Sequence, residues 1–131
     1  MGEEKKKRVL LMDDDEFIRD VVSDQISFLG YEIELAEDGR EAIELYKKRK
    51  EEGKSFDLII MDLTIKGGMG GEEAIAEIRK LDKDLPVVVS TGYSDDDIVR
   101  NYKSYGFSGV LTKPFKMDEL KKLIEELTER D

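Results

Sequence analysis

The sequence predicts a single doubly wound α/β domain, in which a parallel sheet of five strands is covered by five helices on its two faces. Short, nearly continuous apolar runs alternate five times with longer segments of helical periodicity, and strands of that composition are typical of parallel sheets buried on both faces. The 131 residues have the length of about one domain, and no linker, repeat or low-complexity stretch interrupts them. We therefore expect one domain, residues 8–131, after a short charged tail, residues 1–7.

Five apolar runs mark the expected strands. The third, FDLIIM, is the most apolar, and the second, YEIELA, alternates apolar and polar residues in strand fashion. The expected strands are residues 8–12, 31–36, 56–61, 86–90 and 109–111.

The segments between and after the strands have the periodicity of amphipathic helices. The expected helices are residues 16–28, 40–52, 72–81, 94–105 and 117–129. Asp38 and Gly39 form a turn before the second helix, and Ser94 caps the fourth. The side chains expected to face the sheet are Ile18, Val22, Gln25 and Leu29 on the first helix, Ala42, Ile43 and Tyr46 on the second, Ile75 and Ile78 on the third, and Leu120, Leu123, Ile124 and Leu127 on the fifth.

The composition limits the chemistry that the chain can carry. It has no Cys, which excludes disulfides and thiol nucleophiles, and no His, which excludes imidazole metal sites, His-based triads and a phosphohistidine of its own. The net charge of −10 argues against nucleic acid as a partner. The apolar runs are far shorter than a membrane span, which needs about 20 residues, and we expect a cytoplasmic protein.

Polar residues follow four of the five expected strands. Because ligand sites in open α/β sheets form outside the carboxyl ends of the strands, these residues should meet at one edge. The strand ends carry Asp13, Asp14 and Asp15 after the first strand, Asp62 after the third, Ser90, Thr91 and Gly92 after the fourth, and Thr112, Lys113 and Pro114 after the fifth.

This set of side chains favours phosphoryl transfer assisted by Mg²⁺. Crowded carboxylates raise one another's pKa unless a cation separates them, and a site made only of oxygen ligands favours Mg²⁺ over Zn²⁺. An Asp carboxylate can serve as the nucleophile in such a transfer, with the Thr91 hydroxyl and the Lys113 ammonium on the phosphoryl oxygens. Each motif alone has a structural explanation as a cap, turn or loop, so the prediction depends on their joint placement.

The stretch VLLMDDDEFIR, the strand end at Asp62, the hydroxyl of Thr91 and the sequence LTKPF together resemble the receiver domains of bacterial response regulators. The resemblance extends from Arg8 to Thr128 and implies a flavodoxin-like sheet with strand order 2-1-3-4-5. It also implies a Mg²⁺-dependent phosphoacceptor domain that is not a turnover enzyme. The donor would be a histidine kinase or a histidine phosphotransfer domain, and the output domain or partner stays unidentified.

The resemblance also implies a role for each residue of the site. Asp62 would be the phosphoacceptor and a direct Mg²⁺ ligand. Of the remaining residues, Asp14 would be a direct ligand, Asp13 a ligand through water, the Thr64 carbonyl a third protein ligand, Thr91 the switch hydroxyl, Lys113 the phosphoryl-binding amine with a cis bond to Pro114, and Arg19 the arginine that often follows the acidic pair.

The chain departs from the family pattern at three places. Lys66 stands where a proline is usual, and the loop IKGGMGG is one residue longer than usual and looks like a variant from the receivers of hybrid sensor kinases. Val110 stands where many members carry a switch Tyr or Phe.

Two alternatives stay open at this point. A phosphohydrolase of the haloacid dehalogenase type would use Asp13 and Asp15 as nucleophile and acid, but it would leave Asp62 without a role. A receiver-like scaffold would keep the fold and work without phosphorylation. Catalytic turnover of a phosphomonoester would identify the first, and failure to take up an acyl phosphate would identify the second.

Overall fold

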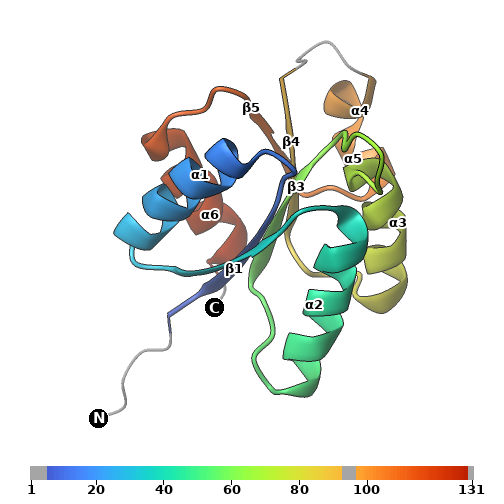
Figure 1. Cartoon of the computed structure of the whole chain (residues 1–131), viewed down its shortest axis with the longest axis horizontal. Helices are drawn as coiled ribbons and strands as arrows, with labels where there is room; N and C mark the ends of the chain where they lie inside the picture. Colours follow the sequence, from blue (N-terminus) through green and yellow to red (C-terminus); the bar gives the residue numbers. More distant parts are fainter. Residues whose placement is uncertain (1–5, 93–96, 130–131) are drawn as a thin grey trace.

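A computed structural model describes residues 6–92 and 97–129. Within these ranges the chain forms a parallel sheet of five strands in the order β2-β1-β3-β4-β5. Figure 1 shows the sheet between its helices. The strands are β1 Arg8–Met12, β2 Glu32–Ala36, β3 Leu58–Asp62, β4 Val87–Thr91 and β5 Gly109–Thr112. The helices are α1 Glu16–Phe28, α2 Gly39–Glu51, α3 Gly71–Leu81, α4 Asp97–Arg100, α5 Tyr102–Tyr105 and α6 Met117–Thr128. The predicted fold class and strand order are therefore confirmed.

Helices cover both faces of the sheet. α1 and α6 lie on one face, and α2, α3 and the two short helices α4 and α5 lie on the other (Figure 1). Because successive strand residues point to opposite faces, β1 sends Val9 and Leu11 to the first layer and Leu10 and Met12 to the second. The domain thus has two apolar layers, one on each face of the sheet, and the apolar runs of the sequence form its strands.

The helix faces agree with the sequence pattern, with one addition. The inward positions expected on α2 and α3 are buried, as are Val22 on α1 and Leu120 and Ile124 on α6. Ile26 of α1 is fully buried although the prediction passed over it, while Gln25 beside it is only half-buried. The stripe on α1 is therefore rotated slightly from the expected one, toward Ile26.

The fourth expected helix, residues 94–105, is divided in the structure. α4 ends at Arg100, and α5 begins at Tyr102. Between them the side-chain amide of Asn101 donates to the carbonyl and to the carboxylate of Asp97, at 3.2 and 3.0 Å. A side chain that bonds nearby backbone in this way competes with helix formation. The expected cap at Ser94 lies outside the described residues.

Both ends of the described chain lie at the edge of the sheet where the strands begin. Lys7 precedes β1, and its ammonium donates to the carbonyl and the hydroxyl of Thr128, at 3.1 and 2.9 Å, where α6 ends. The opposite edge, where the strands end, is formed by loops that lead into α1, α3 and α6. No helix within residues 6–92 and 97–129 combines the length and the apolar character that a membrane crossing requires.

Candidate functional site

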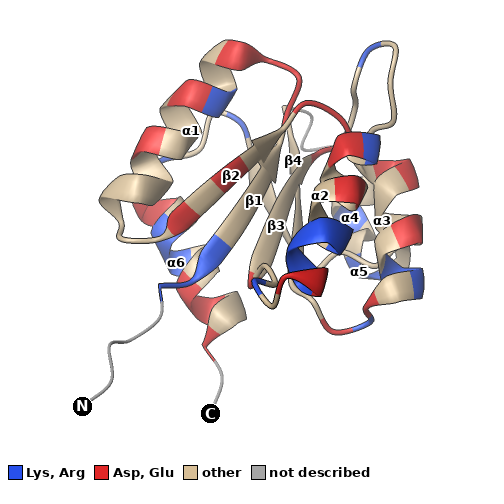
Figure 2. Ribbon diagram, turned by 60° about the horizontal axis from the view of Figure 1, so that its bottom comes forward, with Lys and Arg blue, Asp and Glu red and all other residues tan. Residues whose placement is uncertain are grey.

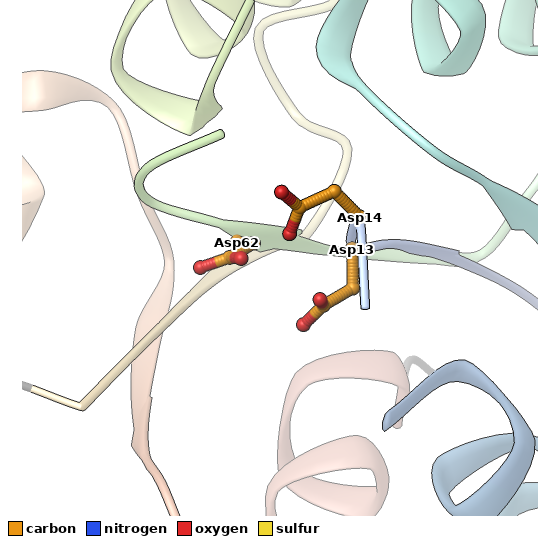
Figure 3. Close-up of side chains that lie close together, drawn as sticks. All are labelled: Asp13, Asp14 and Asp62. Carbon is orange, nitrogen blue, oxygen red and sulfur yellow. The ribbon is translucent and has the colours of Figure 1, made fainter. Parts of the chain in front are cut away.

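Three carboxylates meet where β1 and β3 end. Asp13 and Asp14 follow β1 directly, and Asp62 is the last residue of β3. The register pairs Met12 with Met61, so the residues that follow on the two parallel strands are neighbours at the same edge. Each of the three side chains offers an oxygen within 4.8 Å of the others. Figure 3 shows the three side chains gathered at this point. All-oxygen donors at this spacing suit a hard divalent cation such as Mg²⁺.

Asp13 is held firmly in this cluster. Its side chain is 2% exposed and accepts a hydrogen bond of 2.8 Å from the ammonium of Lys113. Its other carboxylate oxygen accepts from the backbone N–H of Asp15 at 2.9 Å. Its backbone is held as well, because the Arg19 guanidinium donates to the Asp13 carbonyl at 2.8 Å. A buried carboxylate is tolerated when it is paired and hydrogen-bonded in this way.

Asp62 has an environment that disfavours its charged form. Burial is the main cause that raises the pKa of Asp62 to about 6, the positive charge of Lys113 opposes the shift, and the nearby charges of Asp13 and Asp14 add to it. The ammonium of Lys113 lies 3.5 Å from Asp62, farther than from Asp13. The carboxylate of Asp62 is therefore only partly neutralised by its neighbours, and a divalent cation would complete the neutralisation.

The ends of β4 and β5 bring a hydroxyl and an amine to the same edge. Ser90 pairs with Asp62, and Thr91 pairs with Thr112 immediately before Lys113. The Lys113 N–H donates to the Thr91 carbonyl at 2.8 Å, and Thr91 is buried. Burial works against the charged form of Lys113, but the hydrogen bond to Asp13 and the charge of Asp62 outweigh it and raise the pKa of the ammonium. The Lys113–Pro114 peptide bond is cis, as expected.

Two predicted residues lie at the periphery of this arrangement. Thr64 is exposed on the loop after Asp62. Asp15 caps α1, where its carboxylate accepts from the N–H groups of Phe17 and Ile18 at 2.9 and 3.3 Å. The structural explanation of the acidic run therefore holds for Asp15, while Asp13 and Asp14 belong to the carboxylate cluster.

The ion pair between Lys113 and Asp13 is the feature of the site that sequence reasoning missed. Lys113 was expected to serve phosphoryl oxygens beside Asp62, and nothing in the sequence indicates which carboxylate it pairs with in the absence of a phosphoryl group. The two residues are 100 positions apart along the chain. The pairing therefore depends on tertiary packing, which brings the residue after β5 to the end of β1.

The structure thus places a carboxylate cluster, a lysine and a buried threonine at the carboxyl ends of the strands of a doubly wound α/β domain, where ligands bind in folds of this kind. Comparison with known families makes this specific, because residues 9–125 match the response regulator receiver domain. The chain belongs to this family, whose members act in two-component signalling.

Relatives of known identity agree with this assignment. The chain is 36% identical to the chemotaxis protein CheY of Thermotoga maritima over 111 residues, which are 84% of this chain and 88% of CheY. It is 36% identical to part of the sensor histidine kinase AruS of Pseudomonas aeruginosa, over 91% of this chain and 12% of AruS. It is 34% identical to part of the transcription factor SKN7 of Chaetomium thermophilum, over 95% of this chain and 16% of SKN7. In these last two relatives it spans less than a fifth of the protein.

A solved structure of similar fold contains a magnesium ion. The receiver domain of the sensor histidine kinase PA1611 from Pseudomonas aeruginosa has a magnesium ion coordinated in its active site cleft, and this chain superimposes on it with a TM-score of 0.83. The match has 25% sequence identity and covers 95% of this chain and 98% of that domain.

Proposed function

We propose that residues 8–131 form a receiver domain that accepts a phosphoryl group from a phosphohistidine onto Asp62 in a Mg²⁺-dependent reaction and thereby changes its interactions with a partner. The observation that carries this proposal is the convergence of Asp13, Asp14 and Asp62 within 4.8 Å, beside the ammonium of Lys113. This arrangement supports Asp62 as the nucleophile, because its neighbours could hold a cation beside it.

Each residue of the site has its own role in the proposed reaction. A carboxylate oxygen of Asp62 attacks the phosphorus, the P–N bond to the donor imidazole breaks, and the imidazole leaves with the bonding electrons and regains a proton. Bound Mg²⁺, held by the carboxylates of Asp14 and Asp62, by Asp13 through water and by the Thr64 carbonyl, would neutralise part of the phosphoryl charge. The Thr91 hydroxyl and the Lys113 ammonium donate to the phosphoryl oxygens outside the metal shell, so that Lys113 leaves Asp13 for the phosphoryl group.

An exposed apolar row on α1 supports a protein as the donor. Phe17, Val21 and Phe28 are 72%, 39% and 79% exposed, and their spacing puts them on one side of the helix. Phe17 belongs to the first turn of α1, three residues after Asp14 of the carboxylate cluster. Glu16, Asp20 and Asp24 form an exposed acidic row beside them, visible as red bands along α1 in Figure 2. We propose that this face binds a helix of the phosphohistidine donor that carries apolar residues flanked by basic ones.

Replacing Phe17 with alanine should slow transfer from a protein donor by about tenfold or more, the usual effect of losing an exposed aromatic anchor at an interface. The probe is the phosphorylated histidine phosphotransfer domain that reacts fastest in a panel from known phosphorelays. Labelling by acetyl phosphate should stay unchanged, because this small donor needs no docking surface. Leu81→Ala, which removes an exposed apolar side chain from α3, is the matched control. Equal rates for Phe17→Ala and the wild type with the protein donor would contradict the docking face.

The function itself is tested by incubating the protein with acetyl phosphate and following its mass. With Mg²⁺ the protein should gain the mass of one phosphoryl group, and without Mg²⁺ it should gain none. A chromogenic phosphomonoester should show no catalytic turnover, whereas a haloacid dehalogenase-type phosphohydrolase would release product continuously. A protein that stays unmodified under all conditions would be the phosphorylation-independent scaffold.

The proposed reaction also suggests a location and a chain of partners. Phosphohistidine donors draw their phosphoryl group from ATP, so we place the domain in the cytoplasm. Output passes to a protein or domain that the phosphorylated surface recognises, and the negative charge of the chain makes nucleic acid an unsuitable direct partner.

A further inference from the structure

The loop of residues 63–71 leads from Asp62 to α3 and is attached to the start of α2. The N–H of Gly39, the first residue of α2, donates to the carbonyl of Met69 at 2.7 Å. The Met69 side chain is partly buried and packs against the apolar layer on this face of the sheet. The loop therefore touches the proposed acceptor at one end and α2 near the other.

The loop, α2 and the end of β3 approach one another so closely that three glycines among them have no room for a side chain. A Cβ atom placed on each of three glycines would lie closer than 3.0 Å to a neighbouring atom. The added Cβ of Gly39 would lie 2.8 Å from the Ala74 Cβ. That of Gly70 would lie 2.5 Å from the Leu63 carbonyl oxygen, and that of Gly71 would lie 2.9 Å from the Asp62 carbonyl oxygen. The backbone of the loop is thus in direct contact with the end of β3. Interiors packed this closely pass small displacements on to their neighbours, because there is no free volume to absorb them.

The first turn of α2 depends on the same short segment that Met69 holds. Asp38 caps the helix, since its carboxylate accepts from the N–H of Glu41 at 2.9 Å. The N–H of Glu37 in turn donates to the Glu41 carboxylate at 2.8 Å. A shift of Gly39 would therefore move the cap and the first turn of the helix together.

We infer that phosphorylation of Asp62 changes the surface formed by residues 37–44, and that the loop of residues 63–71 transmits the change through the contact between Met69 and Gly39. This inference rests on the proposed function. A metal or phosphoryl group that repositions the backbone at Leu63 and Thr64 displaces the loop, and the close contact passes the displacement to α2. The surface so regulated is charged and exposed, with Glu37, Arg40, Glu41 and Glu44 pointing outward.

The amide resonances of the ¹⁵N-labelled protein provide the test, with Mg²⁺ and beryllofluoride as the phosphoryl mimic. The amides of Gly39, Arg40 and Glu41 should shift together with those of the loop. Met69→Ala removes the side chain that packs near Gly39, so it should reduce the shifts in α2. Because coupling between two sites is reciprocal, it should also change the apparent beryllofluoride affinity by about fivefold or more. Gly68→Ala is the control in the same loop, since its new Cβ would meet only contacts of 3.4 Å or longer.

The outcomes separate this inference from the proposed function. Loop amides that shift while Gly39, Arg40 and Glu41 stay unchanged in the wild type would overturn the inference and leave phosphorylation intact. The same holds if Met69→Ala behaves as Gly68→Ala does in both shift and affinity. A protein in which no amide responds to Mg²⁺ and beryllofluoride would instead contradict the proposed function.

Discussion

Replacing Asp62 with asparagine should abolish phosphoryl uptake, so that the mass after treatment with acetyl phosphate and Mg²⁺ stays that of the unmodified chain. Asparagine has nearly the same shape but lacks the carboxylate nucleophile. Of its two neighbours in the cluster, Asp13 is already bound by Lys113 and by the N–H of Asp15, and the proposed reaction uses Asp14 as a metal ligand. Asp24→Asn, which changes an exposed carboxylate on α1 far along the chain from Asp62, should leave full labelling. Labelling that persists in Asp62→Asn would remove Asp62 from its proposed role.

Loss of labelling in this variant should not come from unfolding. The pKa of Asp62 is about 6 in the folded protein, above its ordinary value of 3.8. The folded state therefore binds the proton more tightly than the unfolded state does, and the carboxylate lowers stability as the pH rises from 3.8 through 6. At pH 7 asparagine removes this unfavourable charge, so the melting temperature of the metal-free variant should equal or exceed that of the wild type. A clear fall in melting temperature would contradict the described environment of Asp62.

Magnesium should raise the melting temperature of the wild type, and Asp14→Asn should weaken the response. A ligand that binds only the folded state stabilises it by about 2.7 kcal/mol at 100 times its dissociation constant. For a domain of this size that corresponds to a rise on the order of 10 °C. Asp14→Asn removes one of the three carboxylates of the cluster while leaving Asp62 in place. The measurement is thermal unfolding at increasing Mg²⁺ concentration, and Asp20→Asn on the adjacent helix is the control.

The response should also depend on pH. Metal binding needs the deprotonated carboxylate, so protons compete with Mg²⁺ when the pH falls through the pKa of Asp62 at about 6. The stabilisation should be nearly complete at pH 7.5 (about 1.5 units above the pKa) and much smaller at pH 5. A Mg²⁺ response that is the same in Asp14→Asn as in the wild type, or that does not change with pH, would place the metal elsewhere.

The sequence predicted those parts of the fold that local signals define. The bounds of β1 and α1 agree with the prediction to the residue, because the apolar run RVLLM stops at three consecutive Asp residues and the last of these caps the helix. The division between α4 and α5 was not predicted. Asn101 stands in the middle of the expected helix, and its side-chain amide bonds back to Asp97 where the division occurs. A single polar residue inside an otherwise periodic segment was too weak a signal to outweigh the pattern around it.

The sequence predicted which side chains meet at the ends of the strands, but not how those side chains pair. Residues that end parallel strands must share an edge, so the proximity of Asp13 and Asp62 follows from strand order alone. The preference of Lys113 for Asp13, at 2.8 Å against 3.5 Å for Asp62, depends on how the ends of β1, β3 and β5 lie relative to one another. Those features are tertiary, and no local pattern along the chain encodes them.

The bond between Lys7 and Thr128 bears on how such a domain can be joined to other modules. Both ends of the described chain leave the sheet at the edge opposite the carboxylates (Figure 1). A fusion partner, a fluorescent reporter or a surface anchor would therefore be joined through chain that leaves the domain at the end opposite Asp62, away from the side on which the proposed donor must approach. A linker can therefore leave the domain without crossing the carboxylate cluster. This suits a domain whose match covers 12% of the sensor kinase AruS and 88% of the chemotaxis protein CheY.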